Sequence, residues 1–146
     1  MSIQRTASQA WEAMFRATVT IGRELAAGEA GAELKGPEYG VLYALSQKPE
    51  GMRITDLGED VLLTQTGLTR LAARLVRKGL VQRAPDPEDG RATLLLLTDR
   101  GRAAQRKIGT IHAREITAAM TARLTEEELL ALRALCAKLS GAPPVA

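Results

Sequence analysis

The feature that most constrains the fold is an amphipathic stretch from Thr64 to Lys78. Its apolar residues recur at the i, i+3, i+4 and i+7 spacing of one helix face: Leu68, Leu71, Ala72 and Leu75. Thr64 is a favourable N-cap for this helix, and Gly79 is a favourable terminator. The stretch therefore predicts a helix that buries one face in a core and leaves the other face in solvent.

The solvent face of this helix carries an uneven charge. From Leu62 to Pro85 the chain has no acidic residue and five cations: Arg70, Arg74, Arg77, Lys78 and Arg83. Such a stretch is either an ordinary solvated face or a footprint for a polyanion. No carboxylate on the helix supplies the i,i+4 partner that stabilises an ordinary exposed helix, which favours the polyanion.

Periodicity and capping residues before and after this helix predict a mainly α fold with a small β component, of the α+β class. The expected helices cover residues 8–28, 55–62, 64–78 and 98–122, with others starting at 37 and 126, and the expected strands cover 80–84 and 92–97. Thr55 and Thr98 are expected N-caps. Thr125 and Glu128 have the spacing of a capping box, which predicts a helix start at Glu126.

The first and last predicted helices have large apolar faces. A small helical core of about 60 residues formed by the middle of the chain could not cover them. In the last helix the stripe is Leu129, Leu132, Cys136 and Leu139. These faces either pack within one chain or pair between two chains. We favour pairing between two chains.

Composition excludes several classes of function. The 146 residues are 45% hydrophobic and 25% charged, which predicts one globular domain over 1–146. No apolar run approaches the roughly 20 residues of a membrane span, and a single cysteine excludes an internal disulfide, so we expect a cytoplasmic protein without membrane contacts. His112 is the only histidine and lies within a predicted helix, so we predict no enzyme, no metal site and no cofactor.

Two short helices joined by a tight turn, 55–62 and 64–78, form the pattern of a helix-turn-helix. When its apolar stripe faces the domain, the second helix turns five polar side chains outward: Gln65, Thr66, Thr69, Arg70 and Arg74. Gln and Arg can form two hydrogen bonds to adenine and guanine edges, and Thr can contact a phosphate or a thymine methyl group. With Thr64 at the start of the helix, these residues are the predicted DNA-reading set.

The motifs of residues 54–101 resemble those of the multiple antibiotic resistance regulator (MarR) family. They are ITDLG at 54–58, LTQTGLTRL at 63–71, RKGLVQR at 77–83, DPEDGR at 86–91 and LTDRG at 97–101. The family usually has Asp-Arg-Arg at its wing tip, whereas this chain has Asp89-Gly90-Arg91. Gly90 therefore removes one expected phosphate contact.

The resemblance implies a winged helix-turn-helix over about 37–97, with dimerisation helices over about 8–30 and 98–140. It implies a homodimer that binds a pseudo-palindromic operator in double-stranded DNA, and repression is the commoner mode of regulation in the family. Asp89 and Arg91 match the family's wing residues, which implies that Arg91 enters the minor groove. Asp89 is close enough in sequence to orient the Arg91 guanidinium through a charge-assisted pair.

Many members of the family respond to small lipophilic or phenolic molecules bound between the dimer core and the DNA-binding lobe. By that resemblance, the candidate effector residues are Trp11, Phe15, Arg16, Tyr39 and Tyr43, for which core and interface packing is the alternative. Two other functions stay open: a winged-helix module for protein contacts, and a thiol-responsive regulator that uses Cys136. The place of Cys136 on an apolar stripe favours a buried structural thiol.

Overall fold

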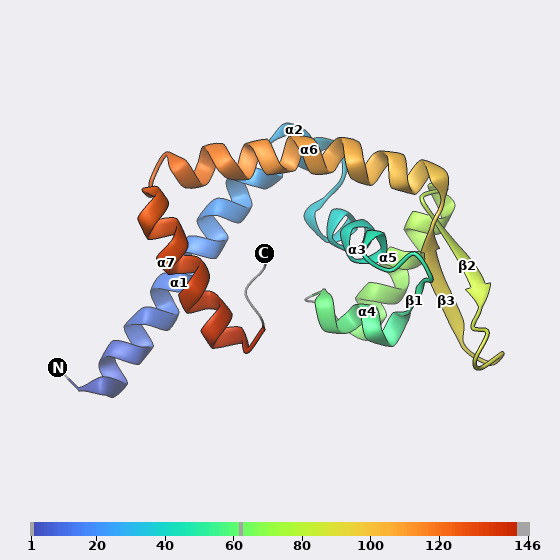
Figure 1. Cartoon of the computed structure of the whole chain (residues 1–146), viewed down its shortest axis with the longest axis horizontal. Coiled ribbons are helices and arrows are strands. Elements are labelled where there is room, and N and C mark those ends of the chain that lie inside the picture. The colour runs from blue at the N-terminus through green and yellow to red at the C-terminus, as the bar shows by residue number, and fades with distance from the viewer. Residues whose placement is uncertain (1, 62, 143–146) are drawn as a thin grey trace. The chain divides into compact units, whose positions relative to one another are not determined.

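The computed structural model describes residues 2–61 and 63–142 (Figure 1). Helices dominate, and three short strands form one antiparallel sheet, which confirms the predicted mainly α, α+β class. The elements are α1 (Ile3–Ala26), α2 (Glu29–Glu33), α3 (Gly36–Ser46), β1 (Met52–Arg53), α4 (Ile54–Asp60), α5 (Gln65–Arg77), β2 (Val81–Pro85), β3 (Thr93–Leu97), α6 (Asp99–Thr121) and α7 (Glu126–Ser140).

The chain divides into two compact units. One unit, here called the winged lobe, comprises Ala26–His112, and the other, the terminal unit, comprises the residues up to Leu25 and from Ala113 onward. The winged lobe extends beyond the predicted 37–97, because it also takes in α2 and the first part of α6. The prediction that residues 1–146 form a single domain stays a prediction.

The sheet of the winged lobe has the strand order β1-β3-β2. β2 and β3 form a hairpin in which Val81 pairs with Leu97 and Pro85 pairs with Thr93. Both hairpin strands lie within one residue of their predicted bounds. β1 pairs with the middle of β3 and has only two residues, too few for an alternating pattern to reveal.

One hydrophobic core holds the winged lobe together. The predicted stripe of α5 lies within it, because Leu68, Leu71, Ala72 and Leu75 are all at most 2% exposed. The remaining core residues come from α2, α3, α4, α6 and the three strands, together with Leu34 after α2 and Leu80 before β2. Helix α5 therefore contributes its whole apolar face to the core, which fixes the face that it presents to solvent.

Three predicted N-caps of the helices after residue 63 are confirmed. The hydroxyls of Thr64 and Thr98 accept from the backbone N–H three residues on, at 3.0 and 2.9 Å. Thr125 and Glu128 form both hydrogen bonds of the capping box. These side chains satisfy N–H groups that a helix start leaves unpaired, so they determine where α5, α6 and α7 begin.

The predicted N-cap Thr55 is wrong. Helix α4 begins at Ile54, after the N-cap residue Arg53, whose side chain makes no cap hydrogen bond. The reason is that β1 pairs with β3 through Arg53, so the strand runs directly into the helix. Helix α4 ends at Asp60, and the predicted end at Leu62 lies outside the described residues.

The first helix also differs from its predicted bounds of 8–28. Helix α1 begins at Ile3 and ends at Ala26, and the short helix α2 follows with Gly28 as its N-cap. The chain turns tightly at this point, because a Cβ atom on Gly31 would lie 2.4 Å from the carbonyl oxygen of Ala26. The close approach explains a glycine inside α2, where the sequence pattern shows only a helix terminator.

The terminal unit exposes many apolar side chains. No residue of α1 or α7 is buried in the described chain, and Trp11 and Phe15 of α1 are 66% and 60% exposed. On α7 the exposed large apolar residues are Leu130, Leu132, Leu135 and Leu139. Cys136 is exposed as well, whereas the sequence favours a buried thiol, because Leu132 and Leu139 on the same stripe are exposed too. Within the unit, Arg123 forms an ion pair with Glu24.

None of the described helices combines the length and the apolar character that crossing a bilayer requires.

Candidate nucleic-acid interface

Helices α4 and α5 form the helix-turn-helix of the winged lobe. Leu57 of α4 and Leu68 of α5 are both fully buried, and a Cβ atom on Gly58 would lie 3.5 Å from Leu68 Cδ2. The two helices are therefore in van der Waals contact at this position. Since the apolar stripe of α5 faces inward, its polar residues face solvent.

The N-terminal half of α5 presents most of the predicted reading set. Thr64, Gln65, Thr66, Thr69 and Arg70 are all exposed. The side chains of Gln65, Thr66 and Arg70 form no hydrogen bond or ion pair with the part of the chain that the structure describes. Their donors and acceptors are therefore available to a ligand.

Two threonines of this set already have protein partners. Thr64 Oγ1 caps the helix, and Thr69 Oγ1 donates to the carbonyl oxygen of Gln65 at 2.9 Å. The hydroxyl oxygen of Thr69 keeps acceptor capacity, and its methyl group remains free for an apolar contact. Both residues stay compatible with the predicted role, although their hydroxyl protons or lone pairs are partly used.

Arg74 differs from the other predicted readers. Its Nε lies 3.3 Å from Glu38 Oε1, and Lys78 Nζ donates to Glu38 Oε2 at 2.8 Å. Glu38 comes from α3 and is only 3% exposed. The sequence does not reveal this partner, because Glu38 lies on another helix and shows no i,i+4 relation to Arg74.

The wing is the β2–β3 hairpin with its tip at residues 86–92. Asp86 Oδ2 accepts from Arg53 Nε at 2.7 Å, and Asp86 Oδ1 accepts from the backbone N–H of Glu88 at 2.9 Å. The N–H of Asp86 also donates to the carbonyl oxygen of Ala92 at 3.0 Å. Asp86 therefore closes the base of the tip and attaches it to the start of α4.

The contact between Asp86 and Arg53 favours the charged form of both side chains. The N–H of Glu88 and the Arg53 guanidinium lower the pKa of Asp86 below its usual value. The hydrogen bond to Asp86 and the charge of that carboxylate raise the pKa of Arg53. Both groups favour their charged forms, as expected for a charge-assisted hydrogen bond.

The predicted pair between the Asp89 carboxylate and the Arg91 guanidinium is wrong. Asp89 Oδ1 instead accepts from the backbone N–H of Arg91 at 3.1 Å, and the N–H of Ala92 donates to the carbonyl oxygen of Asp89 at 2.9 Å. Both bonds belong to a local turn, which side chains of the Asp type commonly stabilise. Arg91 is exposed, and its guanidinium forms no ion pair with any residue that the structure describes.

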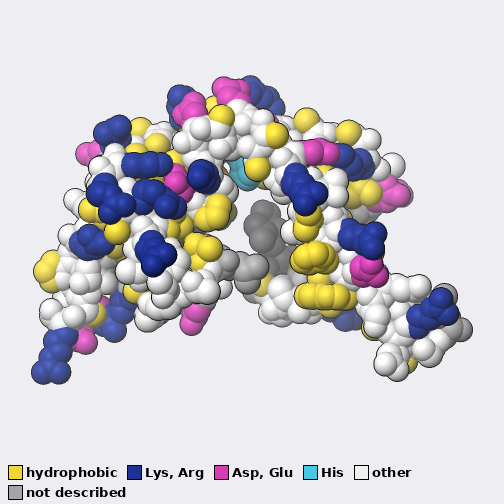
Figure 2. All heavy atoms as spheres, turned by 180° about the vertical axis from the view of Figure 1, so that it is seen from behind, with side chains coloured by type: hydrophobic (Ala, Val, Ile, Leu, Met, Phe, Trp, Pro, Cys, Tyr) yellow, Lys and Arg dark blue, Asp and Glu magenta, His cyan; other side chains and the backbone are white. Residues whose placement is uncertain are grey.

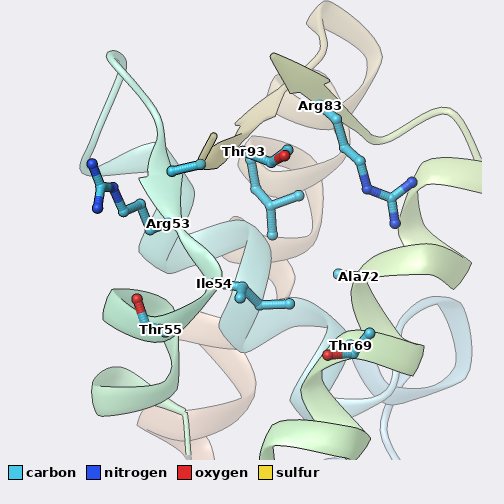
Figure 3. Close-up of a pocket in the computed structure, with 9 residues that line it drawn as sticks. Arg53, Ile54, Thr55, Thr69, Ala72, Arg83 and Thr93 are labelled. Carbon is cyan, nitrogen blue, oxygen red and sulfur yellow. The ribbon is translucent and has the colours of Figure 1, made fainter. Parts of the chain in front are cut away.

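A groove of about 420 Å³ lies between the helix-turn-helix and the sheet (Figure 3). Figure 3 shows Thr69 and Ala72 on α5, Ile54 and Thr55 at the start of α4, and Arg83 on β2 around this space. The remaining lining residues are Arg53, Ala92, Thr93 and Leu95. Arg53, which is paired with Asp86, and Arg83 are thus cations that line this groove and lie outside the predicted set. The acid-free stretch contains Arg83, whereas no sequence signal points to Arg53.

The predicted effector residues fall into the two units. In the winged lobe, the Tyr39 ring packs on His112 with centroids 4.9 Å apart and on Tyr43 with centroids 6.3 Å apart. Tyr43 is half exposed. In the terminal unit, Trp11, Phe15 and Arg16 are exposed on α1, and Arg16 forms an ion pair with Glu12. His112 is thus a packed histidine. No group of His, Cys, Asp and Glu within 2–61 and 63–142 has the arrangement of a metal site.

Comparison with known proteins identifies the fold family. The model of the MarR family matches residues 32–92. The transcriptional regulator TtmR of Methylorubrum extorquens (strain PA1) is 36% identical over 101 residues, which are 69% of this chain and 51% of TtmR. The PcaV transcriptional regulator of Streptomyces coelicolor is 30% identical in sequence, and its crystal structure is a complex with its natural ligand. That match covers 97% of this chain and 94% of PcaV, with a TM-score of 0.66. The chain belongs to the MarR family.

The MarR fold extends over nearly the whole chain. A cysteine-to-serine mutant of MarR from E. coli, in a crystal structure with operator DNA, matches with a TM-score of 0.81 over 95% of this chain and 99% of that one. At 22% identity this likeness concerns the fold alone. The chain spans about half the length of the curated relatives it matches. The predicted family and fold are confirmed, and the family consists of transcriptional regulators rather than enzymes.

We predict that replacing Asp86 by Asn lowers the free energy of unfolding in a pH-dependent way. Because folding lowers the pKa of Asp86, its contribution is fully present above its unfolded pKa, about 3.9. The contribution is lost as the pH falls through the lowered folded value. Urea unfolding of both proteins should therefore show a difference that is constant near neutral pH and shrinks in acid.

Glu88→Gln is the matched control, since the Glu88 side chain forms no hydrogen bond or ion pair among the described residues. It should leave the free energy of unfolding almost unchanged across the same pH range. An Asp86→Asn difference that grew towards low pH would contradict the assignment.

Proposed function

We propose that the protein is a homodimeric transcriptional regulator that binds a specific double-stranded DNA operator in the cytoplasm. We further propose that it acts as a repressor and that a small-molecule effector releases it from DNA. The observation that carries the proposal is the exposed N-terminal half of α5, whose polar side chains at Gln65, Thr66 and Arg70 lack partners among the described residues. This half-helix belongs to the stretch from Leu62 to Pro85 that contains no acidic residue, and the wing follows that stretch. Lys and Arg side chains gather over the lobe in Figure 2.

In this proposal, α5 enters the major groove of the operator. Gln65 and Arg70 have the donors and acceptors to recognise base edges, and Thr66 and Thr69 can contact a phosphate or a thymine methyl group. Thr64 lies at the helix start, where the backbone N–H groups and the helix dipole favour a phosphate. The chemistry of the exposed residues supports sequence-specific reading rather than charge attraction alone.

The wing supplies the second contact of the proposal. The carboxylates of Asp86 and Asp89 order the tip, because they accept hydrogen bonds from the backbone N–H groups of Glu88 and Arg91. The exposed Arg91 guanidinium then projects from an ordered tip without a partner in the described chain. A narrow, electronegative minor groove is a suitable site for such a side chain.

We predict that Arg91→Ala weakens operator binding at least tenfold, which corresponds to about 1.4 kcal/mol. Since a dimer carries two wings, the slope of log affinity against log salt should become shallower by roughly two phosphate equivalents. Titration of operator duplex at several salt concentrations measures both effects. Arg5→Ala, an exposed arginine of the terminal unit, is the control. Unchanged affinity and slope for Arg91→Ala would mean that the wing is a solvated loop without a DNA contact.

The proposed homodimer would cover the apolar surface of the terminal unit. Leu135 and Leu139 of α7 are 61% and 74% exposed, and α1 contributes Trp11 and Phe15. Exposed apolar surface on this scale favours association, because burying each large side chain contributes about 2 kcal/mol. Two copies would supply two reading helices for a pseudo-palindromic operator.

We predict that the wild-type protein sediments at about twice the chain mass of 15.7 kDa. The double variant Leu135→Glu/Leu139→Glu should sediment as a monomer, because burying two carboxylates at an interface is strongly unfavourable. Both side chains are exposed in the single chain, so circular dichroism should show unchanged helix content. A wild-type monomer that binds operator DNA would refute the dimer.

The proposed effector is a small lipophilic or phenolic molecule. Two findings support it: a 30% identical solved relative, PcaV, has a natural ligand, and Tyr39, Tyr43 and His112 form an aromatic group in the winged lobe. Tyr43 is half exposed, so part of this aromatic side chain is accessible to such a molecule. Trp11, Phe15 and Arg16 remain the proposed contacts of the terminal unit.

We predict that a panel of small phenolic compounds contains one that releases the protein from operator DNA. Tyr43→Ala should raise the concentration for half release about tenfold, the loss expected when one aromatic contact of about 1.4 kcal/mol is removed. Competition by fluorescence anisotropy measures the release. Equal sensitivity of both proteins would exclude Tyr43 from the effector site.

A further inference from the structure

A single carboxylate of α3 binds two cations: Arg74 of α5 and Lys78, the C-cap residue of that helix. Glu38 is 3% exposed, and each of its oxygens faces a different side chain. Arg74 Nε lies 3.3 Å from Oε1, and Lys78 Nζ lies 2.8 Å from Oε2. A buried carboxylate is unfavourable unless it is paired and hydrogen-bonded, and here both oxygens are paired.

The two cations belong to a longer row on α5. Thr66, Arg70, Arg74 and Lys78 follow one another at i,i+4 spacing, so they lie along one side of the helix. Thr66 and Arg70 are exposed and have no partner among the residues the structure describes. Arg74 and Lys78 are only about half exposed and are held by Glu38. One end of the row is free for a ligand, and the other end is attached to the lobe.

The contacts of Glu38 restrict the rotation and axial position of α5, which its apolar stripe does not. Hydrophobic packing is non-directional, so a leucine stripe tolerates small rotations and shifts of a helix along its axis. Charge-assisted hydrogen bonds depend on distance and direction, and Glu38 makes contacts one helical turn apart. A rotation of α5 would lengthen both contacts together.

We propose that Glu38 is a positioning residue for DNA reading, which fixes the rotation and axial position of α5 so that its free N-terminal half meets the base edges in register. The inference rests on the proposed function. Arg74 then acts through Glu38 and supports the reading helix rather than recognising a base itself. This assignment replaces the reader role that the sequence predicts for Arg74.

The proposal predicts that loss of the Glu38 charge changes specific and non-specific DNA affinity in different ways. Removing the Glu38 charge misplaces the readers and weakens specific binding. The same change releases two cations and raises the net charge of the lobe by one, which favours non-specific binding to phosphates. A residue needed only for folding would instead lower both affinities together, because both scale with the folded fraction.

The test compares Glu38→Gln with the wild-type 146-residue chain on two duplexes. One duplex carries the sequence that the wild type selects from a randomised pool, and the other carries a scrambled sequence of equal composition. Glu33→Gln is the matched control, because Glu33 also pairs with a lysine of the lobe, Lys107, at 3.1 Å, and that lysine lies on α6 rather than α5. We expect Glu38→Gln to lower the ratio of specific to non-specific affinity at least tenfold. Its non-specific affinity should stay equal or rise. Glu33→Gln raises the charge of the lobe by the same amount but does not touch α5, so it should keep the wild-type ratio.

Repeating the selection with variants separates positioning from reading. Glu38→Gln should relax preference across the whole half-site, because every contact of α5 depends on its position. Arg70→Ala should relax preference at one base pair, as expected when a single base-edge contact is lost. If Glu38→Gln folds poorly, Lys78→Gln removes one of the two contacts and should lower the affinity ratio in the same direction.

An affinity ratio for Glu38→Gln equal to that of Glu33→Gln would overturn the inference while leaving the proposed function intact. A parallel loss of specific and non-specific affinity would also overturn it, in favour of a folding role. If the wild type bound no duplex, the proposed function would fail, and the inference with it.

Discussion

The burial of the apolar stripe of α5 is the interaction on which the rest of the winged lobe depends. Leu68, Leu71 and Leu75 belong to the core, together with residues of the helices and of the sheet. Each fully buried leucine contributes about 2 kcal/mol, so the stripe is a large part of the stability of a lobe of this size. Because a helix has one inward face, the same burial decides which side chains reach solvent.

Two buried carboxylates fix how the elements around this core are oriented. Glu38 and Asp86 are the buried charged residues of the described chain, and each one joins elements that are distant in sequence. Glu38 joins α3 to α5, and Asp86 joins the wing to Arg53 at the start of α4. The leucines thus define a compact lobe, while the two acids define how its DNA-facing parts are placed. Apolar contacts alone would leave that placement less determined.

Local signals explain why much of the fold could be predicted. The caps at Thr64, Thr98 and Thr125 act within one turn of chain, so their partners are visible in the sequence. The α5 stripe is equally readable, because helical periodicity is a property of consecutive residues. Thr55 is the exception, since strand pairing of the preceding Arg53 takes the place of a cap.

The polar contacts of the candidate site could not be predicted in the same way. The partner of Arg74 lies 36 positions earlier in the chain (74 − 38), and that of Asp86 lies 33 positions earlier. Such pairs exist only once the fold has brought the elements together. At the wing tip the difficulty is chemical instead: Asp89 could bind a guanidinium or a backbone N–H, and short loops favour the second because it costs less side-chain entropy.

The free side chains at the start of α5 have an evolutionary consequence. Gln65, Thr66 and Arg70 contribute no side-chain hydrogen bond or ion pair within the described chain, so replacing them would cost the lobe little stability. After a gene duplication, one copy could acquire a new target sequence through a few substitutions at these positions while its scaffold remained under unchanged selection. Recognition and foldability are thus encoded in separate residues of one helix, which lets a lineage diversify its regulatory targets without passing through unstable intermediates.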